Sequence, residues 1–265
     1  MLILLPPSEG KTRPESGPPL DLEALSFPRL SPVRAQLLRT LVKLCNGNPQ
    51  RAIAVLGLGT TQVDSITVNA NLIEEPAARA DAIYTGVLFS ELDLPSLDPE
   101  TRERADQSLA IASALFGLLR PSDLIPAYRL SGTVSLPRLG TVAGRWRAPL
   151  PRVMQELTGD GLLVDLRSGT YTALGKPPPE LAPRTATMRV LHEHQGVRKV
   201  VSHFNKATKG RVVRGLLESG ADPRTIDELQ SVLSDLGWTV EREGQRLDVV
   251  VAEVQPGRVV SPARR

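Results

Sequence analysis

The chain has 265 residues, of which 41% are hydrophobic, and carries a formal net charge of +3 from 32 basic and 29 acidic side chains. This length and apolar content suit one large domain or two small ones, and the near balance of charge does not by itself require a nucleic-acid partner. No apolar stretch approaches the ~20 residues of a membrane span, and the first five residues are too few for a secretory signal, so we expect a cytoplasmic protein.

Cysteine and histidine, the usual ligands of transition metals, are scarce in this chain. Cys45 is the only cysteine, which excludes an internal disulfide and a thiolate cluster. His192 and His194 have no further ligand close to them in the sequence, and their alternation is typical of a strand end. We therefore predict no metal site and no cofactor.

The first five residues predict a buried strand that delivers the loop PPSEGKT to one edge of the fold. The end of this loop resembles a phosphate-binding P-loop, but Leu5 stands where that motif needs its first glycine, and the two prolines lack amide donors. Ser8, Glu9 and Lys11 instead form a compact group of donor, acceptor and cation at a strand end, where α/β folds place their ligands.

A second segment of interest follows a helix predicted over residues 32–45. Gly57 and Gly59 lie between two apolar flanks, as in the hairpin of a helix-hairpin-helix element. Glycines let such a turn expose backbone N–H groups to a nucleic-acid phosphate, and Thr60 adds a hydroxyl. The alternative is that the glycines cap the end of a helix. If the segment binds DNA, we expect no sequence preference.

Asp98, followed by proline, predicts the start of a helix over residues 98–119. Arg120, Asp123 and Arg129 then lie on an irregular segment after that helix, and loops held by rigid elements are where function concentrates. The alternative is a salt-bridged turn, in which Asp123 caps the next element and Arg120 covers a helix C-terminus.

Later segments predict short strands, which alternate with helices. The predicted strands are Leu162–Leu166, Met188–Leu191, Lys199–Phe204, Trp238–Arg242 and Leu247–Val254. No linker divides the chain, so we predict a mixed α/β (α+β) fold in a single compact domain over residues 1–255, with a central mixed sheet flanked by helices. Residues 256–265 predict a basic flexible tail.

Residues 198–217 contain six Lys and Arg side chains and no acid, on what reads as a strand running into a helix. At about 100° per residue, Lys206 and Lys209 share the direction of the apolar face of this helix, while Arg211 and Arg214 point largely the other way. Because an ammonium on an apolar face needs a partner, the geometry indicates a cleft lined with positive charge. The alternative is a solvated face, along which lysine stems cover apolar surface.

Several segments together resemble the peroxide stress protein YaaA family over most of the chain: MLILLPPSEGKT at the N-terminus, DAIYTGVLF at 81–89, SALFGLLRPSDLIPAYRL at 113–130, VDLRSGTY at 164–171 and VSHFNKATKG at 201–210. The resemblance implies a cytoplasmic bacterial protein with a helix-hairpin-helix element and a positively charged cleft, which binds duplex DNA and limits its oxidative damage. In the first loop, PPSEGKT stands in place of a shorter Ser-Pro-Ala-Lys-Thr pattern. Lys11 keeps the corresponding lysine, and Glu9 adds a carboxylate.

Two functions from different classes therefore remain open. In the first, a peroxide stress protein binds double-stranded DNA without sequence specificity; in the second, an enzyme acts on a small phosphorylated or nucleobase-like anion in the same pocket, with Lys11, Asp123 and Lys206 as candidate catalytic residues. We expect a monomer. The predicted DNA- or anion-binding residues are Ser8, Lys11, Gly57, Gly59, Thr60, Arg120, Arg129, Asn205, Lys206, Lys209, Arg211 and Arg214.

Overall fold

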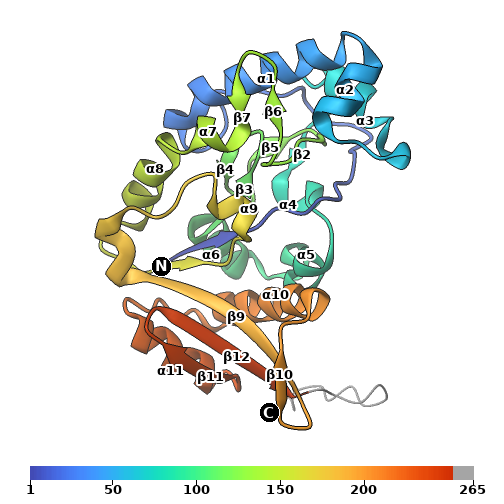
Figure 1. The fold of residues 1–265 in the computed structure, drawn as a ribbon. Helices are drawn as coiled ribbons and strands as arrows, with labels where there is room; N and C mark the ends of the chain where they lie inside the picture. The colour runs from blue at the N-terminus through green and yellow to red at the C-terminus, as the bar shows by residue number, and fades with distance from the viewer. Residues whose placement is uncertain (253–265) are drawn as a thin grey trace.

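The structure of the protein, a computed structural model, describes residues 1–252, apart from the side chains of residues 202, 203 and 252 (Figure 1). The predicted basic tail, residues 256–265, and the last three residues of the predicted domain lie outside the described residues.

A mixed sheet of eight strands runs through the molecule in the order β11-β12-β9-β8-β1-β3-β4, with β10 paired to β9. Its strands are β1 (Leu2–Leu5), β3 (Leu109–Ser113), β4 (Gly117–Leu119), β8 (Leu163–Asp165), β9 (Thr185–His194), β10 (Val197–Lys199), β11 (Thr239–Glu243) and β12 (Arg246–Ala252). β1 is parallel to both β3 and β8, β8 is parallel to β9, and β9 is parallel to β12. Two further sheets have two strands each, β2 (Ala78–Arg79) with β5 (Leu124–Ile125), and β6 (Ser135–Leu136) with β7 (Gly140–Thr141).

Helices surround this sheet (Figure 1). The α-helices are α1 (Ser31–Cys45), α2 (Pro49–Leu56), α3 (Ser65–Ala70), α4 (Ala80–Ile83), α5 (Val87–Leu92), α6 (Pro99–Ser108), α7 (Val142–Trp146), α8 (Pro149–Thr158), α9 (Gly169–Thr172), α10 (Ser202–Ser219) and α11 (Ile226–Asp235). The 3-10 helices are η1 (Pro28–Leu30), η2 (Thr60–Gln62), η3 (Leu94–Ser96) and η4 (Pro179–Arg184). α10 packs against α5 and β9, and α11 packs against β11.

The central strands are apolar on both faces because both faces are covered. All residues of β1, β3 and β8 are buried, so these strands read as continuous apolar runs rather than alternating ones. The carboxyl ends of these three parallel strands meet at one edge of the sheet, which we call the carboxyl edge. This is the edge at which open α/β sheets bind their ligands.

Two buried polar side chains fix the helices of the upper part of Figure 1 to the β3–β4 hairpin. The guanidinium of Arg34, on α1, donates to the carbonyls of Phe116 and Leu118 at 2.9 Å each, and burial lowers its pKa to about 10. The indole N–H of Trp146, on α7, donates to the carbonyl of Ala114 at 2.8 Å. Gly117, at φ 78°, lies against the same indole, where a Cβ would come within 2.8 Å of the ring.

The mixed α/β class and the central mixed sheet flanked by helices are confirmed. The helix predicted over 98–119 is wrong in its second half, since α6 ends at Ser108 and the next five residues form β3. The strand predicted at Lys199–Phe204 is also wrong beyond its first residue, because α10 begins at Ser202. The other predicted strands are present, with Glu253 and Val254 outside the described residues.

Candidate functional site

The loop after β1 is held at the carboxyl edge by backbone contacts with the end of α4. Thr12 N–H donates to the carbonyl of Ile83 at 2.9 Å, and Lys11 forms a β-bridge with Tyr84. Gly10 lies so close to Thr85 that a Cβ would be 3.0 Å from the threonine hydroxyl. The loop is therefore closely packed, and it turns the Lys11 side chain toward the interior.

The amine of Lys11 lies in an enclosed, mainly aromatic environment. Its Nζ donates to the carbonyl of Ser8 at 3.1 Å and lies 4.4 Å and 5.3 Å from the ring centroids of Tyr128 and Tyr84. Within residues 1–252 it makes no ion pair. Burial lowers the pKa of Lys11 to about 8; the attraction of Glu9 opposes this change and the repulsion of Arg129 adds to it. An amine whose pKa is close to neutral pH can act as a cation or as a proton acceptor.

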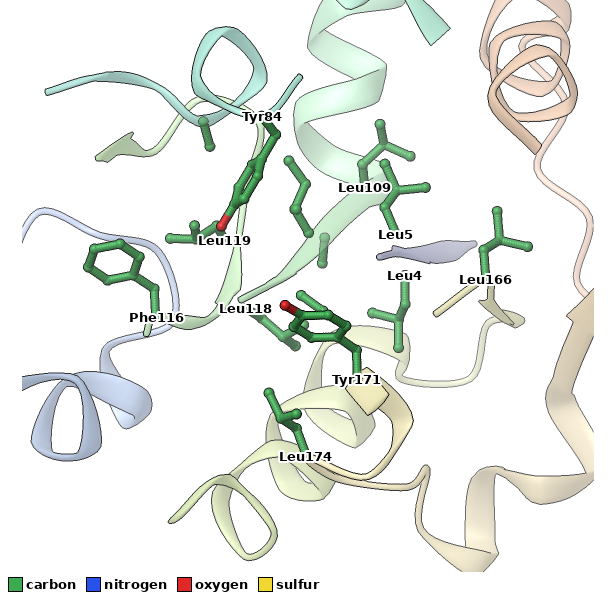
Figure 2. Packing of buried hydrophobic residues seen from close by; sticks show 14 of the residues in the cluster. Leu4, Leu5, Tyr84, Leu109, Phe116, Leu118, Leu119, Leu166, Tyr171 and Leu174 are labelled. Carbon is green, nitrogen blue, oxygen red and sulfur yellow. The ribbon is translucent and has the colours of Figure 1, made fainter. Parts of the chain in front are cut away.

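Two buried tyrosine hydroxyls lie beside this amine. The hydroxyls of Tyr84 and Tyr128 are 2.9 Å apart, and that of Tyr128 is 2.7 Å from the hydroxyl of Ser113, the last residue of β3. In Figure 2 the hydroxyls of Tyr84 and Tyr171 point toward one another across the same region. Burial raises the pKa of all three tyrosines, so they stay protonated at neutral pH and serve as hydrogen-bond donors.

Arg129 adds a second cation at the mouth of the loop. Its guanidinium donates to the carbonyl of Glu9 at 3.1 Å and pairs with the Glu9 carboxylate at 3.3 Å. Its backbone is fixed by the amide of Asn69, on α3, which donates to the Arg129 carbonyl at 2.8 Å and accepts from its N–H at 2.9 Å. We call Ser8, Lys11, Tyr84, Tyr128 and Arg129 the Lys11 cluster.

A third basic group, Lys209, lies at the carboxyl edge, where it contacts the end of β8. Nζ of Lys209, on α10, donates to the carbonyl of Leu166 at 3.3 Å; burial lowers its pKa, and Asp165 opposes this change. The charge of Asp165 is already balanced by Arg167, whose guanidinium is buried and lies 2.8 Å from the carboxylate. Lys209 therefore adds net positive charge at the carboxyl edge.

The two residues that precede Lys209 in the predicted site differ in their surroundings. The side-chain oxygen of Asn205 is buried and has no hydrogen-bond partner among the described residues. Lys206 is exposed and makes no hydrogen bond or ion pair with the described part of the chain. Of the two, Lys206 is the group that a ligand can reach from solvent.

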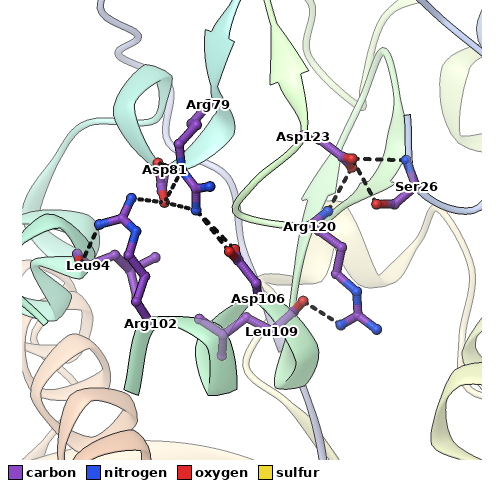
Figure 3. A network of polar contacts seen from close by, with 9 residues as sticks. All are labelled: Ser26, Arg79, Asp81, Leu94, Arg102, Asp106, Leu109, Arg120 and Asp123. Carbon is purple, nitrogen blue, oxygen red and sulfur yellow. Dashed lines mark hydrogen bonds and ion pairs between the residues drawn. The ribbon is translucent and has the colours of Figure 1, made fainter. Parts of the chain in front are cut away.

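Asp123 and Arg120, which are also predicted site residues, make structural contacts instead. Asp123 accepts from the backbone N–H of Arg120 at 2.8 Å and from the backbone and hydroxyl of Ser26, while Arg120 donates to the carbonyl of Leu109 (Figure 3). Of the alternative of a salt-bridged turn, the capping by Asp123 and the contact of Arg120 with the C-terminus of α6 are present, while no Asp123 ion pair is found among the described residues.

Arg211 and Arg214 lie on the outer face of α10, as the helical geometry predicts, but both are neutralised by acids. Arg211 pairs with Glu91 at 2.7 Å. Arg214 pairs with Glu218 at 2.9 Å and donates to the carbonyls of residues 92 and 93. Both arginines thus fasten α10 to α5 and the turn that follows it.

A helix-hairpin-helix element is not shown at residues 57–60. α2 ends at Leu56 and is capped by Gly57, which takes the left-handed conformation at φ 62°, and η2 and the six-residue α3 follow. Gly59 and Thr60 are exposed. Their contact with phosphate stays a prediction.

Sequence reasoning missed Ser113, Tyr171 and Asn69. Ser113 and Tyr171 follow the apolar runs of β3 and β8, so an assignment of both runs as parallel strands would have placed them at the carboxyl edge. No such signal marks Asn69, whose role depends on the tertiary contact of α3 with Arg129. Within residues 1–252, no group of three or more His, Cys, Asp and Glu side chains could hold a metal ion, and no helix is long and apolar enough to cross a membrane.

Comparisons with known proteins find sequence similarity over nearly the whole chain. A family model described as peroxide stress protein YaaA matches residues 1–244. A UPF0246 protein of Streptomyces coelicolor is 49% identical over 261 residues, which cover 96% of this chain and 100% of the relative. Relatives in Corynebacterium efficiens and Corynebacterium glutamicum, also UPF0246 proteins, are 41% and 39% identical, with 93% and 91% of this chain and 97% and 95% of the relatives covered.

Proposed function

Because the chain belongs to the peroxide stress protein YaaA family, we propose that it serves in the peroxide stress response by binding double-stranded DNA without sequence preference. The family membership supports the role in peroxide stress. The proposed binding to DNA rests on the charge and geometry of the carboxyl edge.

The observation that carries the proposal is an excess of positive charge at this edge and on the adjoining turn of α10. Lys11, Lys206 and Lys209 make no ion pair with the described residues, and Arg129 shares the single carboxylate of Glu9. Cations whose charge is not neutralised by an acid of the protein are the groups that displace counterions from DNA phosphates, and such contacts carry no sequence information. The edge therefore favours a polyanion over a neutral ligand.

Fluorescence polarisation with short labelled duplexes of unrelated sequence tests the proposal. We expect similar affinities for all duplexes and a steep fall of affinity with salt, with a slope of about −0.9 in log–log form for each phosphate contact. The double variant Lys206→Ala with Lys209→Ala should weaken binding to every duplex about equally and reduce the slope by about 1.8. The control is Arg152→Ala with Lys176→Ala, which removes the same charge from exposed positions elsewhere. Absence of binding by the wild-type protein at low salt would refute the proposal.

A second candidate function is enzymatic and has its own supporting observation. The Lys11 amine, with its pKa lowered to about 8 and its ring contacts with Tyr84 and Tyr128, resembles a lysine prepared for proton transfer or nucleophilic attack on a small phosphorylated or nucleobase-like substrate. Lys11→Arg separates the two functions. It keeps the positive charge, so DNA binding should persist, whereas amine chemistry would be lost.

A further inference from the structure

A surface hollow of about 550 Å³ lies away from the carboxyl edge, between α1, the start of α2 and the turn that joins β6 to β7. Within residues 1–252, four of its lining side chains are cations, Arg39, Lys43, Arg51 and Arg138, and none is an acid. All four are exposed. The hollow thus concentrates positive charge at four residues, none of which is among the predicted DNA- or anion-binding residues.

None of these four cations makes a hydrogen bond through its side chain, or an ion pair, with the part of the chain that the structure describes. The sequence explains why. Residues 24–63, which contain α1 and α2, include no Asp or Glu, and neither do residues 124–155, which contain β6 and β7. Both walls of the hollow are therefore built from acid-free segments, and no acid from a third segment reaches them in the described residues, unlike the outer face of α10.

The cations also occupy positions that are locally unfavourable, either for positive charge or for the backbone conformation. Arg39 and Lys43 are four residues apart on α1, where like charges face each other and destabilise a helix. Arg51 lies in the first turn of α2, at the positive end of the helix dipole. Arg138 has a φ of 62°, a left-handed conformation that is strained for a residue with a Cβ. When several local preferences are broken at one place, a functional site is the expected reason.

We propose that this hollow, lined by Arg39, Lys43, Arg51 and Arg138, binds phosphate groups of the DNA backbone, as a second contact surface in addition to the carboxyl edge. The inference rests on the proposed function in one respect, that duplex DNA is the partner. A phosphate in the hollow relieves the repulsion between the cations and supplies the charge that the protein lacks there.

The lining of the hollow favours a backbone phosphate over a free nucleotide. A nucleotide site is expected to enclose the base with apolar or aromatic side chains and to hold the sugar with buried polar groups. Among the described residues, no aromatic side chain lines the hollow. Its side-chain amide, that of Asn48, already accepts from the backbone N–H of Arg51 at 3.1 Å. What remains is exposed positive charge, which is suited to phosphates without reading the bases.

The two basic surfaces are connected by one segment of the chain. Residues 124–155 place Arg129 against the loop of the Lys11 cluster and, nine positions later, Arg138 at the hollow. Asn69 fixes the backbone at one end of this stretch, and the β6–β7 pairing fixes the other. A duplex that contacts both surfaces would therefore bind to a preorganised pair of sites.

The test compares salt titrations of the full-length protein with labelled duplexes for three variants. The hollow variant carries Arg39→Gln, Lys43→Gln and Arg51→Gln; a matched control carries Arg152→Gln, Lys176→Gln and Lys199→Gln, which are exposed lysines and an arginine outside the hollow. We expect the hollow variant to lose about 2.7 from the slope of log affinity against log salt. Its affinity relative to wild type then changes about 40-fold between 50 and 200 mM salt, and the control follows the wild type.

Arg138→Gly, the third variant, gives an independent measurement that does not depend on the folding of the triple variant. Glycine accepts the left-handed conformation without strain, so the thermal midpoint should stay the same or rise while DNA affinity falls. Affinity loss with unimpaired stability supports a contact with ligand and excludes a merely structural role.

The possible failures are distinguishable. If the wild type binds DNA, and Lys206→Ala with Lys209→Ala weakens binding, but the hollow variant and Arg138→Gly bind as the wild type does, the inference is wrong and the proposed function stands. If the wild type binds none of the duplexes, the proposed function falls and takes the inference with it.

Discussion

Replacement of Lys11 by methionine should stabilise the protein at neutral pH, and the gain should disappear as the pH rises. The Lys11 pKa is about 8 in the folded protein, compared with an ordinary value of 10.5. Between these values the unfolded chain binds more protons than the folded one, so the stability of the wild type rises with pH over this window. The shift corresponds to about 3 kcal/mol of destabilisation at pH 7 and to less than about 1 kcal/mol at pH 10.

Methionine has a similar length and no charge, so it fills the space between Tyr84 and Tyr128 without the desolvation penalty. It also loses the bond from Nζ to the Ser8 carbonyl and the ring contacts, which together contribute about 1 to 2 kcal/mol. The net gain at pH 7 is therefore about 1 to 2 kcal/mol, but the change with pH keeps its full size.

Urea denaturation of the wild type and of Lys11→Met at pH 7, 8, 9 and 10 measures this difference directly. The variant-minus-wild-type free energy of unfolding should fall by about 2.5 kcal/mol across the series. Lys206→Met is the control, because it makes the same replacement at an exposed lysine. A constant difference for Lys11→Met would show that the amine is not desolvated, and the argument for a specially placed lysine would be lost.

Three further substitutions test the surroundings of the site. Tyr128→Phe removes the hydroxyl that bonds Ser113, and should lower the free energy of unfolding in urea by about 1 to 3 kcal/mol; no loss would mean that water replaces this bond. Asp165→Asn leaves the buried guanidinium of Arg167 without its counterion, and should lower stability by about 3 to 5 kcal/mol in thermal denaturation, with a smaller loss contradicting the buried pair. Arg211→Gln breaks an exposed ion pair, and should change stability by less than about 1 kcal/mol while leaving the salt slope of DNA binding unchanged; a reduced slope would return this arginine to the binding surface.

The fold could be predicted in class but not in the assignment of its apolar runs. Residues 109–119 are apolar almost throughout, so the helix predicted to begin at Asp98 continues through them. In the structure, the buried strands β3 and β4 occupy this run. A short run buried on all sides has neither the period of a helix nor that of a half-exposed strand, so periodicity cannot distinguish the two. Because Ser113 falls within the wrongly predicted helix, it is not predicted to lie at the carboxyl edge.

The site could be predicted where it depends on local sequence and not where it depends on distant partners. Lys11 and Lys209 lie at strand ends or on an apolar helix face, and the structure brings both to the carboxyl edge. Arg211 and Arg214 belong to the same acid-free run, yet acids near residue 91 neutralise them. The absence of acids within a run therefore says little when the run packs against another element.

Acid-free sequence becomes informative when both elements that meet at a surface lack acids. That condition holds at the hollow, where α1 and α2 face the turn between β6 and β7, and it leaves Arg39 and Arg138 unpaired within the described residues. It holds in part at the carboxyl edge, where Glu9 pairs with Arg129 and Asp165 is already balanced by Arg167. In both places the chain accepts a loss of stability, through desolvation of an amine, repulsion between neighbouring cations or a strained backbone. Since a bound phosphate offsets the repulsion between neighbouring cations, variants that remove cations from the hollow should lose DNA affinity without losing stability.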